Sequence, residues 1–268
     1  MRKALVGIFD SGLGGLSVFR EVIKRLPDSS FVYVSDNAWC PYGPRPAEEV
    51  VQRTQKISRF LIGEGCVLIV VACNTATAAA IDALRKSFAV PFVGMEPAVK
   101  PAALHSKTGV VGILATRGTF QGRLYQETSQ RFAAHIRVIE QVGDGLVELV
   151  EQGLADSPLA VQLLHTYIDP MIAAGADHLV LGCTHYPFLI PSIEQISRGR
   201  MVIVDPAPSV AQQVCTVLAQ TGVHTLCTDF PQVYRFYTTG PDTELRSCVY
   251  STIQPSATVD FSAFFPIP

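Results

Sequence analysis

The sequence has no long apolar run and no basic block, and each absence excludes a class of protein. Its apolar stretches are short and are interrupted by glycine, proline or charged residues, which argues against a membrane span. With 21 basic and 23 acidic residues the net charge is −2, so nucleic acid is not expected to be the main partner. The apolar stretch after Met1-Arg2-Lys3 is too short for a signal peptide, so we expect a cytoplasmic protein.

Signals for disulfides, metals and cofactors are also missing. The seven cysteines contain no Cys-x-x-Cys pair, which favours free thiols. His185 follows Cys183 by two residues, but no second Cys/His pair stands at ligand spacing, so no metal is expected. The turn from Gly12 lacks the third glycine of a dinucleotide loop, and its glycines are interpreted as letting Asp10 and Ser11 approach a small ligand. No lysine stands in a context typical of a pyridoxal phosphate Schiff base, and we expect no cofactor.

What the chain does contain is a duplicated motif around two cysteines. Each cysteine follows an apolar run and a small residue and precedes polar side chains, in Ala72-Cys73-Asn74-Thr75 and Gly182-Cys183-Thr184-His185. An acidic residue followed by Pro-Ala comes 23 residues after Cys73, at Glu96, and 22 residues after Cys183, at Asp205. The duplication predicts two equivalent acid/base groups around one site. Such a site suits the transfer of a proton from one face of a carbon to the other.

Buried apolar runs alternate with helical patterns, which is typical of an α/β protein with parallel sheets. Strands are predicted at Leu5–Phe9, Phe31–Val34, Val67–Val71, Phe92–Val93, Val110–Leu114, Ile136–Ile139, Leu179–Leu181 and Met201–Val204. Helices are predicted, among others, at Glu48–Gly63, Ala76–Ser87, Thr119–Ala133, Leu159–Ala174 and Ser209–Thr221. The segment from Tyr250 to Pro268 is rich in Ser, Pro and Phe and is predicted to be irregular.

The duplication predicts two similar open, mostly parallel-sheet domains related by pseudo-symmetry. We expect the first domain to comprise residues 1–95 and 207–268, and the second residues 96–206. In open parallel sheets, ligands bind beyond the carboxyl ends of the strands. Polar clusters follow five predicted strands, at Asp10-Ser11-Gly12, Ser35-Asp36, Cys73-Asn74-Thr75, Thr116-Arg117-Gly118-Thr119 and Cys183-Thr184-His185. If the sheets face each other by these edges, the active site lies in the interdomain cleft.

The side chains in these clusters suit acid/base chemistry. A thiol pKa of ~8.5 allows a cysteine to act as thiolate base or thiol acid, and a helix N-terminus after each strand would favour the thiolate. His185 is a candidate acid/base partner of Cys183. Asp10 is a candidate to cap the next helix, to meet a substrate ammonium or to tune Cys73. Cys40 lies in a polar loop and has no counterpart in the other half. The cysteines interpreted as structural are Cys66, Cys215, Cys227 and Cys248.

Together these motifs resemble the glutamate racemases of the aspartate/glutamate racemase family. The resemblance covers residues 5 to about 215 and rests on Gly7-Ile8-Phe9-Asp10-Ser11-Gly12, Ser35-Asp36, Pro41-Tyr42-Gly43, Ala72-Cys73-Asn74-Thr75-Ala76, Thr116-Arg117-Gly118-Thr119, Gly182-Cys183-Thr184-His185-Tyr186-Pro187 and Val204-Asp205-Pro206-Ala207. It implies a cofactor-independent enzyme that interconverts L- and D-glutamate and supplies D-glutamate for peptidoglycan synthesis. It also implies a homodimer.

The resemblance assigns roles to individual residues. It makes Cys73 and Cys183 the two proton donor/acceptors and Asp10 and His185 their assistants. It places Glu151 near the site, although the chain has Gly143-Asp144 where the family often has Cys-Pro. The implied substrate contacts are Asp10, Ser11, Pro41, Tyr42, Gly43, Cys73, Asn74, Thr75, Thr116, Thr119, Cys183, Thr184 and His185.

Three other interpretations stay open. A racemase of the same fold acting on aspartate or a hydantoin would differ in pocket size. A thiol oxidoreductase would join Cys73 to Cys183 in a disulfide, but such enzymes usually hold the pair in Cys-x-x-Cys. A non-catalytic binding protein with a two-lobed cleft would have no need of both thiols.

Overall fold

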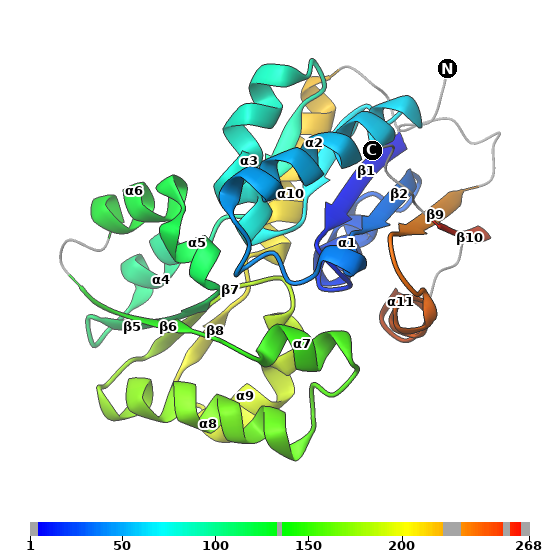
Figure 1. The fold of residues 1–268 in the computed structure, drawn as a ribbon. Helices are drawn as coiled ribbons and strands as arrows, with labels where there is room; N and C mark the ends of the chain where they lie inside the picture. The colour runs from blue at the N-terminus through cyan, green and yellow to red at the C-terminus, as the bar shows by residue number, and fades with distance from the viewer. Residues whose placement is uncertain (1–4, 133–135, 222–231, 254–257, 264–268) are drawn as a thin grey trace.

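The structure is a computed structural model that describes residues 5–132, 136–221, 232–253 and 258–263. One sheet contains β1 (Leu5–Asp10), β2 (Ser30–Ser35), β3 (Leu68–Val71), β4 (Phe92–Gly94), β9 (Val233–Thr238) and β10 (Thr258–Ala263). The other contains β5 (Val110–Ala115), β6 (Arg137–Val142), β7 (His178–Gly182) and β8 (Val202–Val204). Neighbouring strands pair in parallel throughout the described sheets (Figure 1). The α/β class with parallel sheets is confirmed.

The two sheets repeat one strand order. The six-stranded sheet runs β10-β9-β2-β1-β3-β4, and the four-stranded sheet runs β6-β5-β7-β8. The order β2-β1-β3-β4 is therefore repeated by β6-β5-β7-β8, with β9 and β10 added at one edge of the larger sheet. Cys73 follows β3 and Cys183 follows β7, so the cysteines occupy equivalent positions. The division into domains at 95/96 and 206/207 agrees with this topology and stays a prediction.

Helices flank both sheets (Figure 1). They are α1 (Leu16–Arg25), α2 (Ala47–Gly63), α3 (Asn74–Ser87), α4 (Val99–His105), α5 (Arg117–Gln121), α6 (Arg123–Phe132), α7 (Leu146–Glu151), α8 (Pro158–Ala173), α9 (Ile190–Ser197), α10 (Ala207–Gln220) and α11 (Thr243–Cys248). Short turns of 3₁₀ helix lie at η1 (Asn37–Trp39) and η2 (Tyr186–Leu189), and η3 (Val249–Ile253) is a π-helical turn. Among the helices in the described ranges, none combines the length and apolar character that crossing a bilayer requires.

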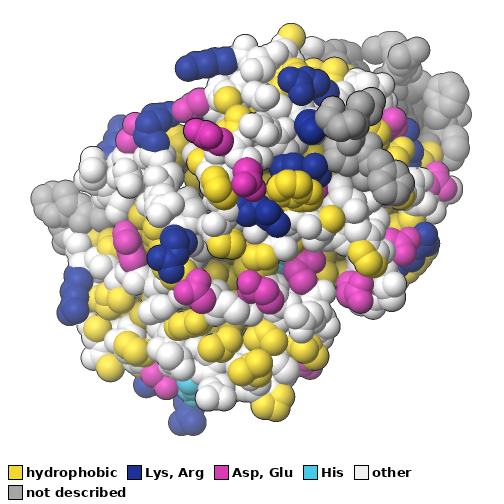
Figure 2. Space-filling view, viewed as in Figure 1, with side chains coloured by type: hydrophobic (Ala, Val, Ile, Leu, Met, Phe, Trp, Pro, Cys, Tyr) yellow, Lys and Arg dark blue, Asp and Glu magenta, His cyan; other side chains and the backbone are white. Residues whose placement is uncertain are grey.

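The central strands are buried and end in register, which positions the site. Strands β3 and β7 are buried along their whole length, as their near-continuous apolar sequences require. Asp10 at the end of β1 lies opposite Ser35 of β2, and Ala115 of β5 lies opposite Gly182 of β7. The polar residues that follow these strands therefore meet at the carboxyl edge of each sheet. On the face in Figure 2, acidic and basic side chains are intermingled over both parts of the molecule.

One predicted helix is interrupted. The sequence predicts Thr119–Ala133 as a single helix, but extended backbone at Gly122 separates α5 from α6. A Cβ at Gly122 would lie 2.5 Å from the Cβ of Ala78 on α3, so the chain bends where α3 comes close. Ala133 lies outside the described residues.

The prediction of an irregular C-terminal segment is wrong. Strand β10 lies there and pairs with β9, and the ring of Phe261 stacks on Phe236 with centroids 5.2 Å apart. Only Val259 and Phe261 of β10 are half-buried, while the other residues of the strand are exposed. Because β10 is an edge strand with one covered face, it has no continuous apolar run in its sequence. Cys227 lies outside the described residues.

Candidate active site

A small cavity lies between the carboxyl edges of the two sheets, and both duplicated cysteines line it. Its lining residues are Ser11, Pro41, Tyr42, Gly43, Cys73, Asn74, Thr75, Thr116, Val147, Cys183, Thr184 and His185. The cavity measures about 10 Å³, which is close to the least that one water molecule needs, ~10–15 Å³. A wider cavity of about 160 Å³ shares Pro41, Gly43, Thr116 and Val147 with it. An amino acid therefore does not fit the smaller cavity unless its walls move.

Hydrogen bonds join segments of the six-stranded sheet's side of the cavity to segments of the four-stranded sheet's side. The Oγ of Ser17, on α1, donates to the carbonyl of Thr184 at 2.9 Å. The hydroxyls of Thr75 and Thr116, which follow β3 and β5, lie 2.8 Å apart. These buried or partly buried contacts link segments from both sheets. They hold the predicted polar clusters around one space.

Cys73 is the N-cap residue of α3. Its Sγ accepts from the N–H of Ala76 at 3.4 Å and lies 4.0 Å from the Oγ of Ser11. Burial, and after it the Asp10 carboxylate, raises the pKa of the Cys73 thiol well above its ordinary value. The Ala76 N–H favours the thiolate, as expected of a helix N-terminus, but burial outweighs it. Cys73 is therefore held as a thiol in the closed cavity.

Cys183 has different neighbours. The turn η2, rather than an α-helix, follows it, so the expected α-helix N-terminus does not stand directly beside this thiol. Its Sγ lies 3.6 Å from Nδ1 of His185, which is buried. The two cysteines thus occupy equivalent places in the fold but have unlike partners.

His185 links Cys183 to Glu151. Its Nε2 lies 2.5 Å from Oε1 of Glu151, and that oxygen also accepts from the N–H of Leu13 at 2.7 Å. Burial alone would lower the pKa of His185, but hydrogen bonds to Cys183, Cys40 and Glu151 outweigh it and raise the pKa well above its ordinary value. The ring is therefore positively charged between a carboxylate and a sulfur.

The glycine-rich turn after β1 leaves space for the side chains of Glu151 and His185. A Cβ at Gly12 would lie 2.0 Å from Oε1 of Glu151, and one at Gly14 would lie 2.4 Å from Nδ1 of His185. From the sequence these glycines are predicted to let Asp10 and Ser11 approach a small ligand. In the structure they allow the close approach of two protein side chains.

Asp10 lies behind the cavity wall rather than on it. It is fully buried, and its Oδ2 accepts from the N–H of Gly15 at 2.7 Å and from the Oγ1 of Thr184 at 3.4 Å. Burial raises its pKa, and the charge of His185 partly opposes this. Because its charge acts on Cys73, Asp10 can tune that thiol from beneath the site.

Thr119 also lies outside the cavity lining. Its Oγ1 is 2.9 Å from Oγ1 of Thr116 and 3.4 Å from the carbonyl of Gly182, so it holds Thr116, which does line the cavity. Val147 on α7 lines the cavity and was not predicted. An apolar side chain on a short helix carries no chemical signal in the sequence.

A buried ion pair holds the loop that contains Pro41, Tyr42 and Gly43. The Tyr42 hydroxyl donates to Oδ2 of Asp36 at 2.5 Å. The guanidinium of Arg53, on α2, bonds both oxygens of Asp36, at 2.9 and 2.5 Å. Paired, bidentate contacts of this kind fix geometry as well as charge. Asp36 therefore orients the loop and does not itself line the cavity.

Asn74 has an unused amide facing the site. Both polar atoms of its side chain are buried, and neither has a hydrogen-bond partner among the described residues. Asn74 lines the cavity. Since buried polar atoms are normally satisfied, this amide is available to a ligand.

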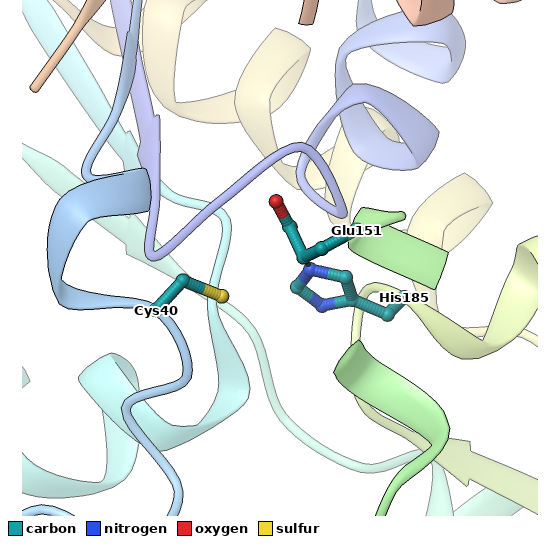
Figure 3. A group of neighbouring side chains, drawn as sticks. All are labelled: Cys40, Glu151 and His185. Carbon is teal, nitrogen blue, oxygen red and sulfur yellow. Dashed lines mark hydrogen bonds and ion pairs between the residues drawn. The ribbon is translucent and has the colours of Figure 1, made fainter. Parts of the chain in front are cut away.

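Cys40, to which the sequence assigned no role, lies beside His185. Figure 3 shows its sulfur directed toward the His185 ring, with Glu151 next to the ring. One ligand atom from each of these three residues lies within 4.8 Å of the others. Burial raises the pKa of the Cys40 thiol to about 11, although its contact with His185 lowers it in part. The polar loop after the second predicted strand was the only signal of this placement.

Comparisons with known proteins point to one family. The sequence pattern of the Asp/Glu/hydantoin racemase family matches residues 11–214. A glutamate racemase of Roseiflexus sp. is 48% identical over 219 residues, 81% of this chain and 80% of that protein. A crystal structure of glutamate racemase from Francisella tularensis in complex with D-glutamate has a TM-score of 0.83 at 26% identity, covering 98% of both chains. The structure of the Escherichia coli glutamate racemase with L-glutamate and the activator UDP-MurNAc-Ala has a TM-score of 0.84 at 30% identity, covering 98% of this chain and 100% of that one.

Proposed function

The chain belongs to the Asp/Glu/hydantoin racemase family, and we propose that it interconverts L- and D-glutamate with Cys73 and Cys183 as the two acid/base groups. The main support for this proposal is that both thiols line one cavity, from equivalent positions after β3 and β7. Glutamate is the substrate of choice because the relatives are glutamate racemases and because both enantiomers are bound in structures of the same fold.

The two thiols start each turnover in opposite protonation states. The positively charged ring of His185 lies 3.6 Å from the Cys183 sulfur, so it can stabilise negative charge that develops there. Burial and Asp10 keep Cys73 protonated. One sulfur removes the proton from Cα while the other delivers its own proton to the opposite face. After that turnover the roles of Cys73 and Cys183 are exchanged, so the reverse reaction can follow.

The substrate carbanion must be stabilised without a cofactor. Preorganised hydrogen-bond donors in a site without water are suited to this, because they need no reorganisation as charge develops. The unpartnered amide of Asn74 is such a donor at the cavity, and the hydroxyl of Thr75, which shares a hydrogen bond with Thr116, is a second. The substrate ammonium meets the negative potential of Asp10, and a positive charge there lowers the cost of forming the Cys73 thiolate.

On the resemblance alone we further propose that the enzyme works in the cytoplasm as a homodimer and supplies D-glutamate for peptidoglycan synthesis. These statements are independent of the site geometry. Size-exclusion chromatography with light scattering tests the dimer, and fractionation of cells tests the location.

The direct test is incubation of purified, dialysed and chelator-treated protein with L-glutamate alone, followed by chiral analysis. We expect D-glutamate to accumulate until the two enantiomers are equal in concentration. L-Aspartate and a hydantoin serve as parallel substrates, and preferential turnover of either would replace glutamate in the proposal. Complete loss of activity on dialysis, restored by pyridoxal phosphate, would overturn the cofactor-independent mechanism.

A further inference from the structure

We propose that Cys40, Glu151 and His185 form a binding site for a thiophilic divalent cation such as Zn²⁺, and that the bound cation inhibits the enzyme. The three side chains come from separate segments: the loop after η1, the end of α7 and the turn after β7. They converge so that one ligand atom of each lies within 4.8 Å of the others (Figure 3). Cation binding does not depend on the proposed function, whereas the inhibition rests on it.

The donor set matches the preferences of zinc. Cysteine sulfur, histidine nitrogen and carboxylate oxygen bind Zn²⁺ at ~2.3, ~2.0 and ~2.1 Å, which places tetrahedral ligand atoms roughly 3.3–3.6 Å apart. Shifts of about 1 Å would bring the three atoms to these separations. A thiolate and a carboxylate neutralise the two charges of the cation, and a neutral imidazole completes three protein ligands. The fourth position is then open to water.

The cation can reach the site from solvent. The side chain of Glu151 is 20% exposed, and Cys40 is half-buried, whereas His185 is 1% exposed and forms the inner wall. The Nδ1 of His185 is already directed toward Cys183, and its Nε2 is directed toward Glu151. A cation would therefore bind at Nε2, in place of the proton between that nitrogen and Glu151.

Binding there would remove the positive charge from the His185 ring. The cation replaces the Nε2 proton that is shared with Glu151, and the thiol of Cys40 releases its proton to solvent. The imidazole keeps its remaining proton on Nδ1. The neutral ring can still donate to the Cys183 sulfur, but it no longer places a positive charge beside that sulfur. The bound cation also fixes Cys40, and its neighbour Pro41 lines the substrate cavity. The prediction that catalysis needs no metal is unaffected, because this cation opposes catalysis.

Binding at the proposed site is measured with Co²⁺, whose absorption reports a bond to a thiolate. Co²⁺ is added to chelator-treated protein, and we expect one equivalent to produce the near-ultraviolet charge-transfer absorption of a thiolate–cobalt bond, which Zn²⁺ then removes. Zn²⁺ alone should inhibit racemisation of glutamate, and a chelator should restore it. In Cys40→Ser the absorption should be lost, and the concentration of Zn²⁺ for half-inhibition, measured against that variant's own activity without metal, should rise at least about tenfold.

Cys215→Ser is the matched control, since Cys215 is a partly exposed free thiol on α10, away from the cavity lining. It should keep both the cobalt absorption and the zinc sensitivity. Equal absorption and equal zinc inhibition in Cys40→Ser and the wild type would place the cation on other thiols and overturn the proposal. Failure of the wild type to bind either cation would do the same. A cobalt band in a protein that does not racemise glutamate would support the metal site and count against the proposed function.

Discussion

Replacing Gly12 by alanine tests whether Glu151 acts on the reaction through His185. The new Cβ would lie 2.0 Å from Oε1 of Glu151 and 2.6 Å from its Cδ. Contacts of a Cβ below 3.0 Å essentially do not occur, so the carboxylate must move by at least about 1 Å. The backbone of Gly12 is not in the left-handed region, so the substitution changes the available space and not the allowed conformation.

The displacement should break the hydrogen bond of 2.5 Å between Glu151 and His185. Losing a hydrogen bond to a charged group costs ~1.5–3 kcal/mol, and each ~1.4 kcal/mol is a factor of ten in rate. A misplacement of about 1 Å near the reacting groups can cost ~10²-fold. We therefore expect kcat to fall ~10–10²-fold, measured in both directions by chiral analysis.

The matched control is Gly63→Ala. Gly63 is the last residue of α2, and nothing lies within 4 Å of a Cβ placed there. Alanine at this position should leave kcat unchanged and raise the free energy of unfolding by up to ~1 kcal/mol. Thermal unfolding of both variants separates loss of activity from loss of fold.

A double-mutant cycle with Glu151→Ala decides the cause. If Gly12→Ala acts by displacing the carboxylate, it should cost almost nothing once that carboxylate has been removed. Penalties that multiply in the double variant would refute the reasoning, because the methyl group would then act elsewhere. A Gly12→Ala enzyme with normal turnover would refute it as well.

Further predictions concern the cysteines and their assistants. Cys73→Ala and Cys183→Ala should each lower turnover ~10²–10⁴-fold or more, and Cys66→Ala should not; a Cys183→Ala enzyme with near-normal rates in both directions would exclude the two-base mechanism. In D₂O the product should carry deuterium at Cα from its first appearance, and mass spectrometry that finds the original hydrogen retained would favour a single base. Asp10→Asn and His185→Asn should impair the two directions unequally in single-turnover experiments. The raised pKa of His185 contributes stability that is fully present below its unfolded-state pKa of ~6.5 and is lost as the pH rises through the folded-state pKa. Raising the pH above ~6.5 should therefore lower the unfolding free energy of the wild type more than that of His185→Asn, as denaturant titrations would measure.

The parts of the fold that the sequence predicts are those in which one physical signal dominates. Strands β1, β3 and β7 are buried on both faces, so their apolar runs identify them without context. The polar residues that end these strands then follow from the parallel arrangement, which places all carboxyl ends at one edge. The expectation that Cys73 and Cys183 share a site came from the duplicated motif, and in the structure both line one cavity.

The parts that sequence reasoning missed depend on contacts between distant segments. Cys40 reaches His185 only because the loop after β2 folds over the turn after β7, and no spacing along the chain encodes that approach. The ion pair of Arg53 with Asp36 joins α2 to the loop it supports, and Arg53 alone looks like an ordinary helical charge. The edge strand β10 is half apolar, so its pairing with β9 depends on the sheet that is already formed.

The two thiols have unlike assistants although the fold places them in equivalent positions. Duplication of one strand order delivers equivalent thiols to a common cavity, but the residues that surround the two thiols differ. Cys73 lies near the carboxylate of Asp10, and Cys183 lies near the imidazole of His185. Because enantiomers have equal free energy in water, the equilibrium constant is one, and kcat/KM must be equal in both directions for every variant. Asp10 or His185 can therefore make kcat and KM differ between the two directions, but both parameters must change by the same factor. The value of kcat/KM alone would hide it, and single-turnover rates in each direction are the measurement that reveals the separate tasks of Asp10 and His185.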